Sequence, residues 1–341
     1  MLLAACTPAI DDEVRLAGIG TARAAPGPMP EPHFSNVSFL AADGQLLPAR
    51  QWLPNGKIAA VILALHGFND YSNAFDMPAA VWARGGIATY AYDQRGFGGA
   101  PGRGRWGGRA ALAADAATAA QVLRRRYPKT PLYLLGESMG GAIAIVAMAG
   151  ESGTPIPDVD GVILSAPAVW GRATMQILPK LALWAGVRMF PALTLTGRGL
   201  EIMPSDNIPM LRALSRDPMV IKGTRIDTIY GLVNLMDAAL ASAPRLTAPI
   251  LLMYGQRDEI VPKLPVRDFV AHLPGPPPDD TGRRRLAYYA QGYHMLLRDL
   301  DGAMVAEDVA SWVINRKAPL PSHADYEQEQ RPWPPHDDPS S

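Results

Sequence analysis

The sequence has little cysteine, no excess of charge of either sign and no long apolar run. Its single cysteine excludes an intramolecular disulfide and a metal site built from cysteines. Lys+Arg and Asp+Glu both number 32, and this balance argues against a nucleic-acid binder, which neutralises phosphates with basic residues. No apolar run reaches the roughly 18 residues of a membrane-spanning helix. With 48% hydrophobic residues among 341, the chain instead has ample material for a folded core.

The one cysteine, Cys6, closes the segment Leu3-Ala4-Ala5-Cys6. This segment resembles a bacterial lipobox, in which a peptidase cuts before a cysteine that becomes lipid-modified, although the charged n-region and most of the apolar h-region of a signal peptide are missing. Two alternatives stay open. If the true start lies upstream of Met1 and Cys6 is lipidated, residues 1–32 form a membrane tether and the protein belongs to the bacterial cell envelope. If the match is accidental, we expect a cytoplasmic protein.

Short apolar runs alternate with helical stretches along most of the chain. This alternation predicts an α/β fold with a mostly parallel central sheet flanked by helices, formed by residues 33–169 and 243–316. The expected helices span 109–126 and 142–149. The expected strands span 59–65, 87–92, 132–135, 162–164, 250–254 and 285–290.

Two segments break the alternation. Residues 170–242 are rich in Leu, Met, Trp and Pro and predict an inserted helical cap, with helices near 178–189 and 225–240. A cap excludes water and lines an acyl pocket, so Trp170, Leu178 and Trp184 are candidate substrate-binding residues; alternatively, such side chains form a small core of the cap itself. Residues 317–341 are Pro-rich and acidic and predict a disordered or surface-wrapping tail.

Gly136-Glu137-Ser138-Met139-Gly140 matches the G-x-S-x-G pattern of a nucleophilic serine. It directly follows an expected strand and precedes an expected helix. In such a turn the backbone of the serine is strained, its hydroxyl projects above the sheet, and side chains larger than glycine at the flanking positions would collide. We therefore expect Ser138 to be the nucleophile.

Serine needs a general base, and His294 is the candidate among six histidines. It follows the expected strand 285–290 and so lies at the carboxyl end of the sheet, where Ser138 also lies. Asp258, after strand 250–254, is the expected partner that orients the imidazole, since Ser, Asp, His is the chain order of an α/β-hydrolase triad. Glu259 and Asp299 are competitors; Glu259 would point away, and Asp299 better suits a cap for a helix starting near Gly302.

The tetrahedral oxyanion needs two preorganised backbone N–H donors. Met139, directly after the nucleophile, supplies one. Phe68, in the loop His66-Gly67-Phe68-Asn69-Asp70 after the strand 59–65, is the expected second donor. His66 is then expected to support this loop through hydrogen bonds.

Five motifs in this order resemble those of the α/β-hydrolases of the monoacylglycerol lipase and lysophospholipase group, classed with the serine aminopeptidase-like hydrolases. The resemblance covers roughly residues 34–316, and it implies an α/β-hydrolase fold with an inserted helical cap. It departs at Phe97, where the family usually has histidine, and at Asp70, where it has glutamate. The matching segments are 66–72, 92–98, 136–141, 255–262 and 292–294.

Four arginines, at positions 95, 103, 105 and 109, occupy a Gly-rich region without an acidic residue among them. They could form a cationic rim that attracts phosphate headgroups or anionic lipid. The favoured interpretation is a solvated loop in which Arg95 pairs with a carboxylate.

Together these features predict a serine hydrolase that cleaves carboxylic esters with apolar acyl chains, of monoacylglycerol or lysophospholipid type, without metal or organic cofactor. The competing functions are a small-ester carboxylesterase, a peptidase or amidase that anchors a substrate amine on Glu201 or Asp206, an acyltransferase, and a catalytically silent lipid-binding lipoprotein. The sequence does not specify an oligomeric state.

Overall fold

A parallel β-sheet forms the centre of the computed structural model, which describes residues 30–151, 153, 155–197, 199, 201–275, 283–325 and 334. Six neighbouring strands, in the order β5-β4-β6-β7-β10-β11, are parallel. Their residues are almost all buried because helices cover both faces, which explains the continuous apolar runs of the sequence. These strands are β4 (Ala60–Leu65), β5 (Ile87–Tyr92), β6 (Leu132–Glu137), β7 (Gly161–Ser165), β10 (Ile250–Gly255) and β11 (Arg284–Tyr289).

An antiparallel extension, which the sequence did not predict, continues the sheet beyond β5. It consists of β3 (Leu46–Trp52), β2 (Ser38–Leu40) and β1 (His33–Phe34). Two of these strands have three residues or fewer, too short for an alternating pattern to be recognised.

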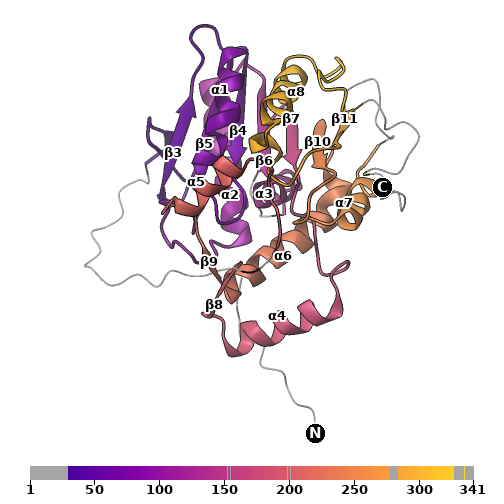
Figure 1. Ribbon diagram of the computed structural model, residues 1–341. Coiled ribbons are helices and arrows are strands. Elements are labelled where there is room, and N and C mark those ends of the chain that lie inside the picture. Colours follow the sequence, from indigo (N-terminus) through magenta and orange to yellow (C-terminus); the bar gives the residue numbers. More distant parts are fainter. Residues whose placement is uncertain are drawn as a thin grey trace.

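Helices cover the two faces of the sheet and form the α/β-hydrolase architecture that the motifs predict (Figure 1). On one face, α1 (Asp76–Arg84) and α8 (Gly302–Ile314) enclose a core that contains Trp82 and Trp312. On the other, α2 (Arg109–Arg126), α3 (Met139–Met148) and α7 (Lys263–Ala271) pack over the larger core. The bounds of α2 are those expected from its Ala-rich sequence. Single-turn helices lie at η1 (Ser72–Phe75), η2 (Ala243–Arg245) and η3 (Leu296–Arg298).

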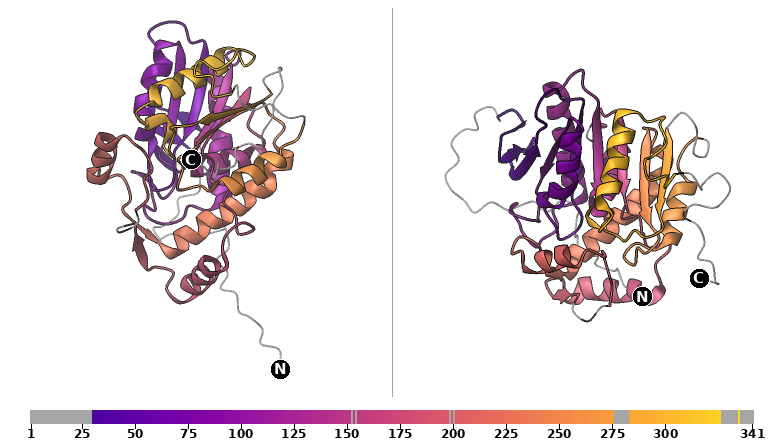
Figure 2. Two further views of the ribbon diagram at one scale, coloured as in Figure 1. Left: turned by 45° about the vertical axis from the view of Figure 1, so that its right-hand side comes forward. Right: turned by 45° about the horizontal axis from the view of Figure 1, so that its top comes forward.

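Most of the described part of residues 170–242, the cap segment, lies beyond one end of the sheet in both views of Figure 2. The expected helices are present as α4 (Ile177–Met189) and α6 (Ile226–Ser242). The segment also contains α5 (Ile208–Arg216) and a two-stranded ribbon of β8 (Thr194–Thr196) and β9 (Gly223–Arg225), which were not expected. Side chains of α6 belong to the larger core, so this helix joins the cap segment to the sheet layer. No helix among the described residues is long and apolar enough to cross a membrane.

The first part of the expected tail wraps the edge of the sheet. Leu320 is fully buried, Ala324 accepts a hydrogen bond from the Tyr288 amide of β11, and Asp325 pairs with Arg285. Residues 317–325 therefore cover the β11 edge, so for this part the surface-wrapping alternative is correct and disorder is wrong. Cys6 and the lipobox-like segment lie outside the described residues.

Candidate active site

Ser138 lies in a sharp turn between β6 and α3. Its backbone has φ 52° and ψ −112°, in the region that non-glycine residues rarely adopt. The flanking glycines are needed for space: a Cβ on Gly136 would lie 2.3 Å from the Gly140 oxygen, and one on Gly140 would lie 2.0 Å from the Leu65 oxygen. Met139 opens α3, so its N–H points out of the helix N-terminus next to Ser138, where negative charge is stabilised.

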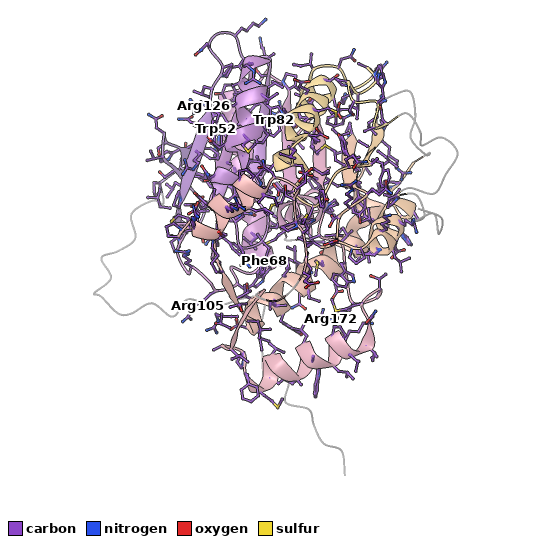
Figure 3. The ribbon with its side chains drawn as sticks, viewed as in Figure 1. Trp52, Phe68, Trp82, Arg105, Arg126 and Arg172 are labelled. Carbon is purple, nitrogen blue, oxygen red and sulfur yellow. The ribbon has the colours of Figure 1, made fainter. Side chains whose placement is uncertain are left out.

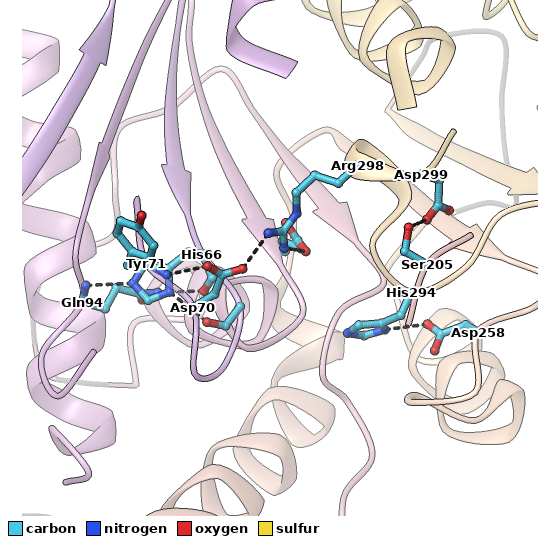
Figure 4. A network of polar contacts seen from close by, with 11 residues as sticks. His66, Asp70, Tyr71, Gln94, Ser205, Asp258, His294, Arg298 and Asp299 are labelled. Carbon is cyan, nitrogen blue, oxygen red and sulfur yellow. Dashed lines mark hydrogen bonds and ion pairs between the residues drawn. The ribbon is translucent and has the colours of Figure 1, made fainter. Parts of the chain in front are cut away.

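The loop after β4 is held by His66. This fully buried side chain donates its Nδ1–H to the Gly67 oxygen (2.8 Å) and accepts the Gln94 N–H on Nε2 (2.9 Å); the Gln94 side chain in turn donates to the His66 oxygen (2.8 Å; Figure 4). Burial lowers the pKa of His66, so it is neutral and supports the loop. A Cβ on Gly67 would lie 3.5 Å from that of Ser138, so the loop abuts the serine.

His294 and Asp258 form a buried hydrogen-bonded pair. The Nδ1–H of His294 donates to Oδ2 of Asp258 over 2.8 Å, while Oδ1 of Asp258 accepts the N–H groups of Ile260 (2.8 Å) and Val261 (2.9 Å). Burial lowers the pKa of His294, but the charge and hydrogen bond of Asp258, together with the charge of Glu137, raise it overall. Asp258 thus fixes the tautomer whose Nε2 is free to accept a proton.

The two competing carboxylates bind backbone and cap-segment groups instead. Glu259 accepts the Met203 N–H over 2.8 Å, as expected of a side chain that points away from His294. Asp299 accepts the Ser205 hydroxyl (2.6 Å) and the Tyr293 N–H (2.8 Å). It does not cap α8, whose N-cap residue is Asp301, so that expectation is wrong. Both carboxylates fasten the cap segment to the loops that carry Asp258 and His294.

Ser138 and His294 line one cavity of about 610 Å³ between the strand ends and the cap segment. Phe68, which Figure 3 labels in this region, also lines it. Of the three cap candidates, Trp170 lines the cavity, whereas Leu178 and Trp184 do not and are 74% and 56% exposed. The apolar wall includes Met175, Pro179, Leu183, Leu195, Ile229, Leu232, Val233, Met236 and Ile260.

Helix periodicity explains why Leu178 and Trp184 of α4, which the sequence predicted to bind substrate, do not line the cavity. Pro179, Ala182 and Leu183 share the face turned toward the cavity, so Leu178 and Trp184 face outward. Because α4 carries apolar residues on both faces, its sequence does not show which face is inward.

A model of the family described as "Serine aminopeptidase, S33" matches residues 56–301. The chain belongs to this family. Monoglyceride lipase from Rattus norvegicus is 28% identical over 295 residues, covering 84% of this chain and 91% of the relative. Monoacylglycerol lipase from Mycolicibacterium smegmatis is 26% identical over 299 residues, covering 82% and 97%. The similarity to monoacylglycerol lipases expected from the five motifs is thereby confirmed.

Solved structures of this fold are similar as well. The monoacylglycerol lipase of Paleococcus ferrophilus superposes with a TM-score of 0.62 at 21% identity, covering 79% of this chain and 99% of the other. A soluble variant of the Saccharomyces cerevisiae monoglyceride lipase gives 0.63 at 18% identity, covering 86% and 100%. At these identities the superpositions show the α/β-hydrolase fold alone.

The acidic residues considered as anchors for a substrate amine do not line the cavity of this S33-family chain. Glu201 is exposed on the cap segment, and Asp206 accepts the Leu300 N–H over 2.8 Å. The family's aminopeptidase description therefore finds no support at either position.

Two of the four loop arginines, Arg95 and Arg109, face carboxylates. Arg95 bonds both oxygens of Asp115 (2.6 and 2.8 Å) and of Asp43 (2.7 and 2.9 Å), as the favoured interpretation expected. Arg103 donates to the Pro218 oxygen, and Arg109 lies 3.7 Å from Glu151. Carboxylates therefore balance the charges of Arg95 and Arg109, whereas the Arg103 partner is a neutral carbonyl and Arg105 is exposed.

Arg298 is a residue of the site that the sequence did not predict. It lies buried four residues after His294 and bonds both Asp70 and Glu137, and all three side chains line the cavity. In the sequence, these three residues are marked only by their position: Asp70 and Glu137 lie inside matched motifs, and Arg298 follows the motif 292–294 by four residues.

Proposed function

We propose that this protein is a serine hydrolase that cleaves carboxylic esters with apolar acyl chains, preferentially of the monoacylglycerol type. The observation that carries the proposal is the cavity, which has Ser138 and His294 in its lining and a largely apolar wall. An acyl chain fits such a wall, and the scissile carbonyl then lies beside the nucleophile.

In the proposed reaction, Ser138 Oγ attacks the ester carbonyl while Nε2 of His294 takes its proton. The N–H groups of Phe68 and Met139 stabilise the oxyanion. The bond to the leaving alcohol then breaks, the alcohol takes the proton from His294, and an acyl-enzyme remains. Water, deprotonated by His294, attacks the acyl carbonyl; release of the acid restores Ser138. Asp258 stabilises the imidazolium at each step.

The charges at the polar end of the cavity favour a neutral headgroup over a phosphate. Asp70, Glu137 and Arg298 carry two negative charges and one positive, all buried. A phosphodiester would meet a net negative site there, at short range and low dielectric. A monoacylglycerol brings only hydroxyl groups, so we favour it over a lysophospholipid.

Simple assays separate this function from the competing ones. A small-ester carboxylesterase would act on acetate and butyrate only, and a peptidase or amidase would cleave amides. A silent lipid-binding lipoprotein would not react with a fluorophosphonate, which labels only an activated serine. Attachment to the cell envelope through Cys6 stays a prediction.

The first prediction is a chain-length optimum set by the cavity wall. With p-nitrophenyl esters of two to sixteen carbons, kcat/KM should peak at medium or long chains, and monoacylglycerols should release glycerol. In Leu183→Trp the added ring fills the cavity, so the optimum should move to shorter chains. Leu178→Trp, on the outward face of the same helix, is the control and should keep the wild-type profile. Activity on acetate and butyrate alone would contradict the proposal.

The second prediction concerns pH. The imidazolium form of His294 cannot accept the serine proton, so kcat/KM should fall as pH falls through the pKa of His294. Because that pKa is raised above the ordinary 6.5, the midpoint of the acid limb should lie above this value. Initial rates across the neutral range measure it; a midpoint clearly below the ordinary value would refute the assignment of His294 as base.

A further inference from the structure

One buried guanidinium connects three loops of the site. Arg298 Nη1 donates to Asp70 Oδ2 over 2.7 Å, and Nη2 donates to Glu137 Oε1 over 2.8 Å. The side chains are 5%, 7% and 2% exposed in the order Arg298, Asp70, Glu137. These three residues are called the Arg298 cluster.

Each member of the Arg298 cluster belongs to a different part of the proposed machinery. Asp70 ends the loop that presents the Phe68 N–H, Glu137 directly precedes Ser138, and Arg298 follows His294 by four residues. Figure 4 shows Arg298 reaching across from the His294 side to Asp70. The two nitrogens engage separate carboxylates, so the planar fork fixes both partners relative to the His294 loop.

Stability alone is a weak reason for such a cluster. Burying three charges costs desolvation free energy that their attraction offsets only in part, and apolar replacements of similar volume are often as stable. Glu137 Oε2 and Arg298 Nε also find no hydrogen-bond partner within the described part of the chain. A charged cluster kept in the wall of the reaction cavity therefore suggests a role in the geometry of the site.

We propose that Arg298 is a positioning residue, whose double contact with Asp70 and Glu137 holds the oxyanion loop and the Ser138 turn in register with His294. The inference rests on the proposed serine-hydrolase function. It requires a cation that can bind two separate carboxylates at once. The planar guanidinium of arginine can do this, whereas the single ammonium group of lysine cannot.

The Arg298 cluster also affects the pKa of His294. Asp258 and Glu137 raise the pKa of His294 and Arg298 lowers it. The other neighbouring carboxylates, Glu259 and Asp299, are turned to backbone N–H groups and Ser205. Loss of the Glu137 charge should therefore move the acid limb of activity to lower pH.

The test compares Arg298→Lys and Glu137→Gln with wild type. Asp325→Asn is the matched control, because Asp325 is a buried carboxylate paired with Arg285 at the far sheet edge. All proteins are assayed well below their melting temperatures. The readouts are kcat and KM on an ester, the rate of Ser138 phosphonylation by a fluorophosphonate, and the pH profile of kcat/KM.

In Arg298→Lys, kcat and the phosphonylation rate should both fall by about 10- to 100-fold, because a misplacement of reacting groups by about 1 Å can cost up to about 100-fold, and KM should change little. Glu137→Gln should move the acid limb to lower pH. Asp325→Asn should lower only the melting temperature.

The positioning role is overturned if Arg298→Lys and Glu137→Gln lower the melting temperature but keep the kcat, phosphonylation rate and acid limb of wild type. This failure is distinct from failure of the proposed function. If the wild-type protein is phosphonylated but hydrolyses no carboxylic ester, the proposed substrate class is wrong. The phosphonylation rates of the variants still test the positioning role of Arg298 in that case. A wild-type protein that is not phosphonylated overturns both.

Discussion

Replacing Ser138 with alanine should reduce kcat on esters by about 10⁴-fold or more, because Ser138 is the nucleophile of the proposed reaction. The melting temperature should stay close to that of wild type. Serine and alanine both carry a Cβ, so the free-energy cost of the strained backbone at φ 52° should be similar in wild type and variant. The effect is therefore expected on chemistry and not on folding.

The measurement is steady-state turnover of an ester together with fluorophosphonate labelling, which should be lost in parallel. Ser215→Ala is the matched control, since Ser215 lies exposed on α5 and its hydroxyl bonds only the Arg212 oxygen within its own helix. Wild-type turnover and labelling in the Ser138 variant would show that another residue is the nucleophile.

Local signals explain why the sequence predicted most of the sheet and the Ser138 turn. The parallel strands are buried on both faces, so each is a short apolar run with a visible end. The constraint on Gly136 is likewise local, because a Cβ there would meet the backbone of Gly140 and Gly141 in the same turn. Gly140 is required by the backbone of Leu65 at the end of the neighbouring β4, but the G-x-S-x-G pattern itself marks this position.

The features that the sequence did not reveal depend on long-range contacts. Arg298 meets partners 228 and 161 positions away, and nothing in its own segment indicates that it is buried. The inward face of α4 is decided by packing against the cavity, since both faces are apolar. Leu320 is buried because β11 is an edge strand against which the tail can pack. The tail is rich in proline and acidic residues, and this composition does not predict such packing.

The Asp258→Asn variant should lose about 10⁴-fold in kcat through the wrong histidine tautomer, as documented for an equivalent change in a serine protease. Asp258 Oδ1 accepts two backbone N–H groups, from Ile260 and Val261, and the oxygen of an asparagine would keep these bonds. Its amide NH₂ then faces Nδ1 of His294, which can only accept. The imidazole proton moves to Nε2, and the base can no longer take the proton of Ser138.

Glu259→Gln is the control for this prediction, because it makes the same chemical change one residue away. The Glu259 carboxylate accepts the Met203 N–H, and a glutamine oxygen can replace it, so kcat should stay near that of wild type. Steady-state kinetics of the two variants decide between the carboxylates. A wrong tautomer should lower kcat by far more than tenfold. If kcat of Asp258→Asn stays within about tenfold of wild type while Glu259→Gln is impaired, Asp258 does not set the histidine tautomer. Impairment of Asp258→Asn alone, with its melting temperature unchanged, assigns the orienting role to the carboxylate that His294 contacts.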